Sequence, residues 1–231
     1  MQSASLAALE ISTGTSPNAS IIWLHGLGAD GHDFAPMAHD LALPFAAQFV
    51  LPHAPLRAVT INGGYRMPAW YDILSGDIAA KQDEAGIRAS QQLIEQFIGQ
   101  ERQRGIPAHR ILLVGFSQGG AIALQTGLRH AERLAGIIAL STYLPLTASF
   151  DTEHSAVNAN LPIFMGHGRQ DTMIAIETAR ASRDFLQARH YNVAWHEYAM
   201  PHSVCLDEIA DIRAFIIQTL NNTQDKAHLP R

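Results

Sequence analysis

The sequence contains a single cysteine, Cys205, among its 231 residues. An internal disulfide is therefore excluded, and a chain of this length can bury most of its apolar surface without such a crosslink. Sparse cysteine also fits a reducing compartment. The first residues, Met-Gln-Ser-Ala-Ser-Leu, lack the basic start and the long apolar run of a signal peptide. Together these absences predict a cytoplasmic protein.

An excess of positive charge and a long apolar run are missing as well. The formal net charge is −5, and no cluster of lysine and arginine stands out. This argues against nucleic acid as a partner, because phosphate binding needs concentrated positive charge. No stretch approaches the roughly 18 to 20 apolar residues of a membrane-spanning helix. We therefore predict no integral membrane association.

Two signatures of metal and phosphate chemistry are absent. The sequence lacks H-E-x-x-H, a zinc-binding pattern of metal-dependent hydrolases, and it lacks the lysine of the phosphate-binding pattern G-x-x-x-x-G-K-[ST]. The 12 histidines are therefore interpreted as dispersed. We predict no metal site.

The sequence does show short apolar runs that alternate with longer amphipathic stretches. Such runs are typical of parallel strands buried on both faces, and helices between them favour βαβ units. The predicted strands cover residues 21–24, 47–51, 111–114, 136–140, 163–165 and 193–198. The predicted helices cover residues 83–104, 118–130, 172–190 and 204–220. The sequence thus predicts an α/β fold with a mostly parallel sheet and helices on both faces.

No internal repeat and no linker divides the chain, so residues 1–231 are predicted to form a single domain. Residues 60–76 are rich in glycine, proline and aromatic side chains and show no clear period. We predict a long loop there, and loops of this length often bind ligands or act as lids. Residues 146–160 form a second irregular stretch.

The candidate nucleophile is Ser117, in the sequence Gly-Phe-Ser-Gln-Gly. The pattern G-x-S-x-G alone is weak, because glycine and serine are common. Here an apolar strand precedes it and a small-residue helix follows it, which is the context of the nucleophile turn of α/β-hydrolases. Gly115 and Gly119 remove side chains that would collide in so sharp a turn, and the helix start favours negative charge near the serine oxygen. The alternative is an ordinary glycine-rich turn with an incidental serine.

A serine hydroxyl needs a base to take its proton, and in this fold the acid and then the histidine follow the serine along the chain. His202 comes after the last predicted strand and before the last helix, whereas His196 lies within a strand and is interpreted as structural. Asp171 follows the strand at 163–165 and would orient the histidine. As an alternative, Asp171 is only the N-cap of the next helix. His167 is expected to shape the loop that carries Asp171.

Acyl transfer also needs two N–H donors for the oxyanion that develops on the former carbonyl. One is the N–H that follows the nucleophile, which belongs to Gln118, and the other comes from a loop after an early strand. In that loop Gly26 and Gly28 flank Leu27 and let its backbone approach a substrate. We assign the second donor to the N–H of Leu27. The alternative is a flexible glycine turn without this role.

Taken together, the sequence resembles the phospholipase/carboxylesterase family of α/β-hydrolases, which includes acyl-protein thioesterases and bacterial carboxylesterases. The matching stretches span most of the chain in the family's order: WLHGLGADGHDF (23–34), PHAP (52–55), AWYD (69–72), GFSQGGA (115–121), LSTYLP (140–145), GRQD (168–171) and HSVC (202–205). The resemblance implies a triad of Ser117, Asp171 and His202, oxyanion donors at Leu27 and Gln118, no cofactor and a homodimer.

The chain departs from the family at one position near the histidine. Many relatives have glycine there, whereas this chain has Pro201. Cys205, in the same loop, is interpreted as a small core side chain rather than a reactive thiol.

These residues lead to the hypothesis of a serine carboxylesterase that hydrolyses short- to medium-chain esters or thioesters through an acyl-enzyme. An acyl-protein thioesterase, a lysophospholipase and an amidase remain alternatives, because a triad does not name the leaving group. A non-catalytic binding protein is a further alternative. Trp70, Ile73 and Leu74 are predicted to line an acyl groove, with the loop at 60–76 as its wall; otherwise they only pack that loop.

Overall fold

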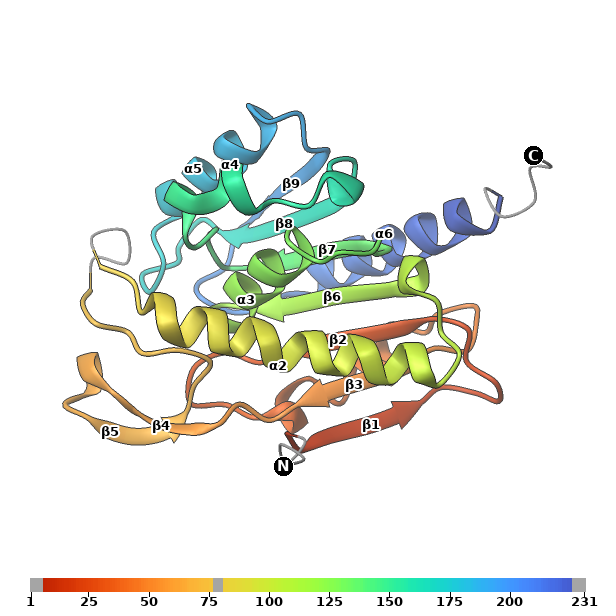
Figure 1. Cartoon of the computed structure of the whole chain (residues 1–231), viewed down its shortest axis with the longest axis horizontal. Helices are drawn as coiled ribbons and strands as arrows, with labels where there is room; N and C mark the ends of the chain where they lie inside the picture. The colour runs from red at the N-terminus through yellow and green to blue at the C-terminus, as the bar shows by residue number, and fades with distance from the viewer. Residues whose placement is uncertain (1–5, 77–80, 226–231) are drawn as a thin grey trace.

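The structure is a computed structural model that describes residues 6–76 and 81–225, apart from the side chains of residues 222–225. Most of the N-terminal residues behind the signal-peptide expectation lie outside these ranges. Figure 1 shows one large β-sheet with helices packed on both faces. No helix in the described ranges has both the length and the apolar composition needed to cross a bilayer.

Seven strands form the large sheet, in the order β1-β3-β2-β6-β7-β8-β9. All neighbours are parallel except β1, which runs antiparallel to β3 at one edge. The strands are β1 Ala8–Ser12, β2 Ser20–Leu24, β3 Gln48–Pro52, β6 Ile111–Phe116, β7 Gly136–Leu140, β8 Ile163–Gly168 and β9 Val193–Tyr198. The predicted α/β fold is confirmed, and of these seven strands only the edge strand β1 was not predicted.

Each face of the sheet has its own hydrophobic core, because successive side chains of a strand point to opposite faces. Ile22 and Leu24 of β2 pack with α2 and α3, whereas Ile21 and Trp23 lie in the core that includes α6. Figure 1 shows α2 and α3 on the near face and α6 behind the sheet. The helices are α1 Met37–Asp40, α2 Glu84–Gln103, α3 Gln118–Gly127, α4 Phe150–Glu153, α5 Ile176–Gln187 and α6 Leu206–Asp225.

The prediction of a long loop at residues 60–76 is wrong for its first half. Strands β4 (Leu56–Val59) and β5 (Tyr65–Pro68) pair antiparallel into a small separate sheet, visible at the left of Figure 1. Gly63 and Gly64 turn the chain between them with φ of 64° and 79°. The sequences LRAV and YRMP do not alternate regularly between apolar and polar residues, which is the pattern by which a half-buried strand is recognised.

Candidate active site

Ser117 lies in the sharp turn between β6, a central strand, and α3. Its φ of 55° and ψ of −120° are strained for a residue that carries a Cβ. A Cβ on Gly115 would lie 2.3 Å from the carbonyl oxygen of Gly119, and a Cβ on Gly119 would lie 2.4 Å from that of Leu24. The turn therefore requires glycine on both sides of the serine.

Ser117, His202 and Asp171 form a continuous hydrogen-bonded chain. Ser117 Oγ lies 2.9 Å from His202 Nε2, and His202 Nδ1 lies 2.7 Å from Asp171 Oδ2. The three residues follow β6, β9 and β8, so the parallel sheet brings its carboxyl ends together here. The Asp171 side chain is fully buried, while 18% of the His202 side chain is exposed. With a neutral imidazole, Ser117 donates to Nε2 and Nδ1–H donates to the carboxylate.

The other oxygen of Asp171 holds the loop that carries it. Oδ1 accepts the backbone N–H groups of Met173 at 2.8 Å and Ile174 at 2.9 Å. The next helix, α5, has Ala175 as its N-cap, so the alternative of Asp171 as a helix cap is wrong. His167 Nε2 lies 2.9 Å from the carbonyl oxygen of Ile174, and burial lowers the pKa of His167. The neutral imidazole thus shapes this loop, as predicted.

The histidine loop accommodates Pro201 without displacing His202. The carbonyl oxygens of Met200 and Pro201 lie so close to Gly168 that a Cβ there would come within 2.3 and 2.4 Å of them. Glycine at the end of β8 therefore makes room for this path. The ring centroid of Phe116 lies 4.8 Å from that of His202, so the two rings are in contact.

Two neighbouring side chains lie outside the hydrogen-bonded chain. His196 stays on β9, where its Nδ1 lies 3.2 Å from Asp211 Oδ2 and its ring stacks on Phe164. Cys205 is half-buried and unbridged, so the interpretation of it as a core side chain is only partly right.

The loop after β2 passes directly beside the nucleophile. A Cβ on Gly26 would lie 3.5 Å from Ser117 Cβ. Gly28 has a φ of 77°, and its N–H donates to the carbonyl oxygen of Pro68 at 2.9 Å. Among the described residues, neither the N–H of Leu27 nor that of Gln118 has a hydrogen-bond acceptor. Both groups are therefore available to an oxyanion.

The side chain of Gln118 is part of a buried network that sequence reasoning missed. Its Oε1 accepts the backbone N–H of Trp70 at 2.8 Å, and its Nε2 donates to the carbonyl oxygen of Tyr71 at 2.7 Å. The indole Nε1 of Trp70 donates to the carbonyl oxygen of His25 at 2.9 Å. Trp70 has no exposed surface, so the prediction that it lines a substrate groove is wrong. Its indole N–H instead finds a buried acceptor.

Ile73 and Leu74 do line a small pocket, together with Tyr71, Gln82 and Tyr143 among others. Its free volume is only about 10 Å³, so an acyl groove lined by Ile73 and Leu74 stays a prediction. A larger pocket of about 870 Å³ lies at the other end of the sheet, where β7, β8 and β9 begin, and none of the predicted site residues lines it.

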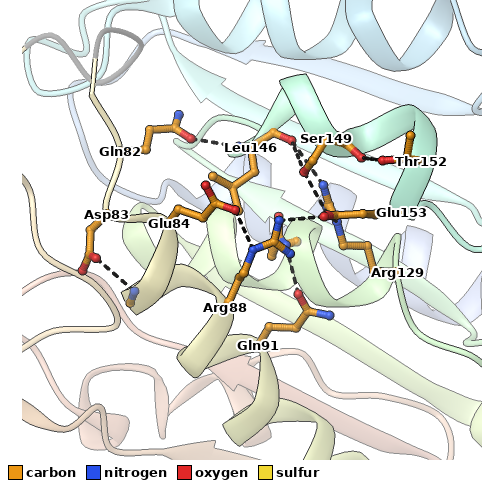
Figure 2. A network of polar contacts seen from close by, with 12 residues as sticks. Gln82, Asp83, Glu84, Arg88, Gln91, Arg129, Leu146, Ser149, Thr152 and Glu153 are labelled. Atoms are coloured by element: carbon orange, nitrogen blue, oxygen red, sulfur yellow. Dashed lines mark hydrogen bonds and ion pairs between the residues drawn. The ribbon is translucent and has the colours of Figure 1, made fainter.

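A network of ion pairs joins the start of α2 to the segment that ends in α4 (Figure 2). Glu153 accepts hydrogen bonds from Arg88 at 2.6 Å, Arg129 at 2.8 Å and Ser149 at 2.9 Å. The two guanidinium groups and the hydroxyl lower the pKa of Glu153 to about 2. Gln82, from the small pocket, accepts the N–H of Leu146 at 2.8 Å in the same network. The network thus includes Gln82, one of the residues that line the small pocket.

Within the described ranges, one group of metal-binding side chains lies close together. The ligand atoms of Asp30, His32 and His53 are within 4.8 Å of one another. However, Asp30 Oδ1 accepts the backbone N–H of His32 at 2.7 Å, and His53 Nδ1 accepts that of Gly31 at 3.1 Å. Because these atoms already hold the loop that follows Leu27, we assign the group to loop structure.

Comparisons with known proteins identify relatives of this chain. The chain is 40% identical to acyl-protein thioesterase 1 of Neurospora crassa over 220 residues, which cover 90% of each protein. It is 37% identical to acyl-protein thioesterase 1 of Yarrowia lipolytica over 212 residues, or 89% of this chain and 93% of the relative.

Solved structures show the same fold. Arabidopsis thaliana SOBER1 superposes with a TM-score of 0.83 at 28% identity, covering 87% of this chain and 99% of that one. Zea mays acyl-protein thioesterase 2 gives a TM-score of 0.79 at 25% identity, and the match covers 93% of this chain and 100% of that one. The sequence model of the Phospholipase/Carboxylesterase family matches residues 7–220. The chain therefore belongs to the phospholipase/carboxylesterase family of α/β-hydrolases, whose members are hydrolases.

Proposed function

We propose that this protein is a serine hydrolase that cleaves acyl thioesters, and carboxylic esters less efficiently, through an acyl-enzyme on Ser117. The observation that carries the proposal is the chain Ser117–His202–Asp171, with its distances of 2.9 and 2.7 Å. A serine held in this way beside a base that is oriented by a buried carboxylate is an activated nucleophile.

In the acylation step, Ser117 Oγ attacks the acyl carbonyl carbon and its proton passes to His202 Nε2. Asp171 stabilises the imidazolium that forms, and the N–H groups of Leu27 and Gln118 donate to the oxyanion. His202 then gives the proton to the departing thiolate or alkoxide. In the second step His202 takes a proton from water, whose oxygen attacks the acyl carbon. The bond between that carbon and Ser117 Oγ then breaks, His202 returns the proton to Oγ, and the carboxylic acid is released.

The choice of thioesters over simple esters rests on the relatives. Those from Neurospora crassa and Yarrowia lipolytica are both named acyl-protein thioesterase 1. This supports the acyl-protein thioesterase alternative more than the short-chain carboxylesterase of our first hypothesis. We also propose a cytoplasmic homodimer, which the family resemblance suggests.

A pair of matched substrates tests the proposal. One peptide carries an acyl group on cysteine, and the other carries the same acyl group on serine, in chain lengths from acetyl to palmitoyl. We expect a higher kcat/KM for the thioester and a loss of about 10³-fold or more with Ser117→Ala, since removal of the nucleophile leaves only binding and oxyanion contacts.

Other outcomes separate the alternatives. A wild-type enzyme without Ser117-dependent turnover of any ester or thioester contradicts the proposal and favours a binding protein. Preferred cleavage of a lysophospholipid or of the matched amide assigns the site to those substrates instead. His202→Ala should abolish the acylation burst with p-nitrophenyl esters while its melting temperature stays close to that of the wild type; an unchanged burst would assign the base to another histidine.

A further inference from the structure

The short segment at residues 68–71 contacts both loops that supply the oxyanion donors. On one side, the carbonyl oxygen of Pro68 accepts the N–H of Gly28, and the indole of Trp70 donates to the carbonyl oxygen of His25, each at 2.9 Å. These two contacts bracket Leu27. On the other side, Gln118 forms its two side-chain hydrogen bonds with the backbone of the same segment, at 2.8 and 2.7 Å.

The contacts that Trp70 forms with His25 and Gln118 are shielded from water. Trp70 and His25 have no exposed surface, and Gln118 is 2% exposed. Ser90 of α2 donates to the carbonyl oxygen of Trp70, which anchors the segment to a long helix. Breaking one of these bonds would leave a buried polar group without a partner, which is costly in a dry interior. The segment is therefore held rigidly between the two loops.

His25 also has both ring nitrogens engaged. Its Nε2 accepts the N–H of Ala54 at 3.0 Å, and its Nδ1 lies 2.7 Å from the carbonyl oxygen of Gly26. Burial lowers the pKa of His25, so the ring stays neutral and serves both partners. His25, on the N-terminal side of Leu27, is thus held by the contacts of its imidazole ring and by the hydrogen bond from Trp70 to its carbonyl oxygen.

We propose that Trp70 and the side chain of Gln118 are positioning residues that set the distance between the two oxyanion donors, the N–H groups of Leu27 and Gln118. This inference rests on the proposed function. An oxyanion hole works only when its donors sit about 3 Å from the developing charge, and a displacement of about 1 Å can cost about 10²-fold in rate. Because the two donors belong to separate loops, a third element must fix their positions relative to each other.

Two matched pairs of variants test this assignment. Trp70→Phe removes the indole donor, and its control is Trp23→Phe, a tryptophan that is equally buried but whose Nε1 has no partner within the described structure. Gln118→Met removes both amide bonds at nearly constant shape. Its control is Gln125→Met on the same helix. The buried amide of Gln125 donates a hydrogen bond to Gln91 Oε1 at 2.9 Å and forms none with the described residues of the oxyanion loops.

Steady-state kinetics on the acyl thioester gives the first measurement. We expect kcat to fall about 10-fold in Trp70→Phe and about 10- to 100-fold in Gln118→Met, with KM within threefold of wild type. Both controls should keep kcat within threefold. The substitution pairs remove similar buried surface, so the difference within each pair does not reflect stability alone.

Binding of a transition-state analogue gives the second measurement. An alkylboronic acid adds to Ser117 as a tetrahedral anion, whereas the product carboxylic acid binds without that geometry. Across the four variants, the loss in boronic acid affinity should match the loss in kcat/KM, while the affinity for the carboxylic acid should stay constant. A purely structural role would not produce this selective loss.

The assignment is overturned if either variant matches its control in kcat, or if KM rises while kcat is unchanged, because the residues would then bind substrate or only support the fold. If Trp70→Phe does not fold, Gln118→Met and its control decide the question. Absence of Ser117-dependent turnover in the wild type instead defeats the proposed function itself, and this is measured before any variant is compared.

Discussion

Asp171 divides its two carboxylate oxygens between two tasks. Oδ2 faces His202, and Oδ1 accepts the N–H groups of Met173 and Ile174. In Asp171→Asn, those two N–H groups require the amide oxygen at the Oδ1 position. The amide NH₂ must then face His202 Nδ1, which reverses the tautomer that Ser117 needs.

We therefore expect Asp171→Asn to lower kcat by about 10³- to 10⁴-fold at neutral pH while the protein stays folded. Asp211→Asn is the matched control, because Asp211 also pairs with a histidine, His196, but outside the site. Its kcat should remain within threefold of wild type. Steady-state kinetics and thermal melting measure both, and an active Asp171→Asn would remove Asp171 from the mechanism.

Glu208, in the first turn of α6, is a buried carboxyl that has no use in this mechanism. It has no exposed surface, and neither of its oxygens has a partner among the described residues. Burial, with a smaller effect of nearby Asp211, raises its pKa from 4.5 to about 8. Between these two values the folded protein binds more protons than the unfolded chain, so stability falls as pH rises from 4.5 to 8.

Glu208→Gln removes this proton linkage. We expect the variant to lose less stability than wild type between pH 5 and pH 8. The difference in melting temperature, variant minus wild type, should therefore increase by several degrees from pH 5 to pH 8. Asp207→Asn, an exposed change in the same turn, should follow the wild-type curve. Parallel pH profiles for wild type and Glu208→Gln would contradict the raised pKa.

At the scale of elements, the turn between β6 and α3 tolerates no side chain at Gly119. A Cβ there would lie 2.4 Å from the carbonyl oxygen of Leu24 and 2.5 Å from that of His25, both in backbone that cannot move aside cheaply. Gly99, within α2, has no atom within 4 Å of its Cβ position. The two glycines therefore provide opposite cases for the same substitution.

Gly119→Ala should destabilise the protein by at least about 2 kcal/mol, because β2 and α3 must separate, and it should impair the oxyanion site as well. Gly99→Ala should stabilise it by about 0.5–1 kcal/mol through helix propensity. Chemical denaturation measures both values. Equal effects of the two substitutions would refute the close approach at the turn.

Across the whole molecule, Glu153 ties together helices that are distant in sequence. It bonds Arg88 of α2 and Arg129, whose side chain is only 4% exposed. The pKa of Glu153 is lowered from 4.5 to about 2. Its contribution to stability is therefore fully present above about pH 4.5 and is lost as pH falls through about 2.

Glu153→Gln should destabilise the protein by about 1–3 kcal/mol at pH 7, because Arg129 would lose its charge partner in a buried position. The variant should also show a weaker dependence of stability on pH below 4.5. Asp151→Asn, which breaks the exposed pair with Arg189, is the control and should change stability much less, because solvent screens exposed ion pairs. Urea denaturation at several pH values separates these outcomes.

The sequence alone determined the parallel sheet and the order of serine, aspartate and histidine. Strands such as β6 and β7 are continuous apolar runs because both of their faces are covered, and that pattern is local. The G-x-S-x-G turn is local only in part: Gly115 is required by the nearby backbone of Gly119, whereas Gly119 is required by the distant backbone of Leu24 and His25. The edge strand β1 and the β4–β5 hairpin were not predicted, because they are partly exposed and their apolar residues follow no clear period.

Only the tertiary structure decided what Trp70 and the amide of Gln118 contact. Their hydrogen bonds join residues 45 to 48 positions apart, and an amide or indole side chain carries no sequence signal for a partner so distant. The same holds for Glu153, whose partners Arg88 and Arg129 lie 65 and 24 positions away. Local pattern fixes which residues form strands and turns, whereas the pairing of buried polar groups depends on how the finished layers meet.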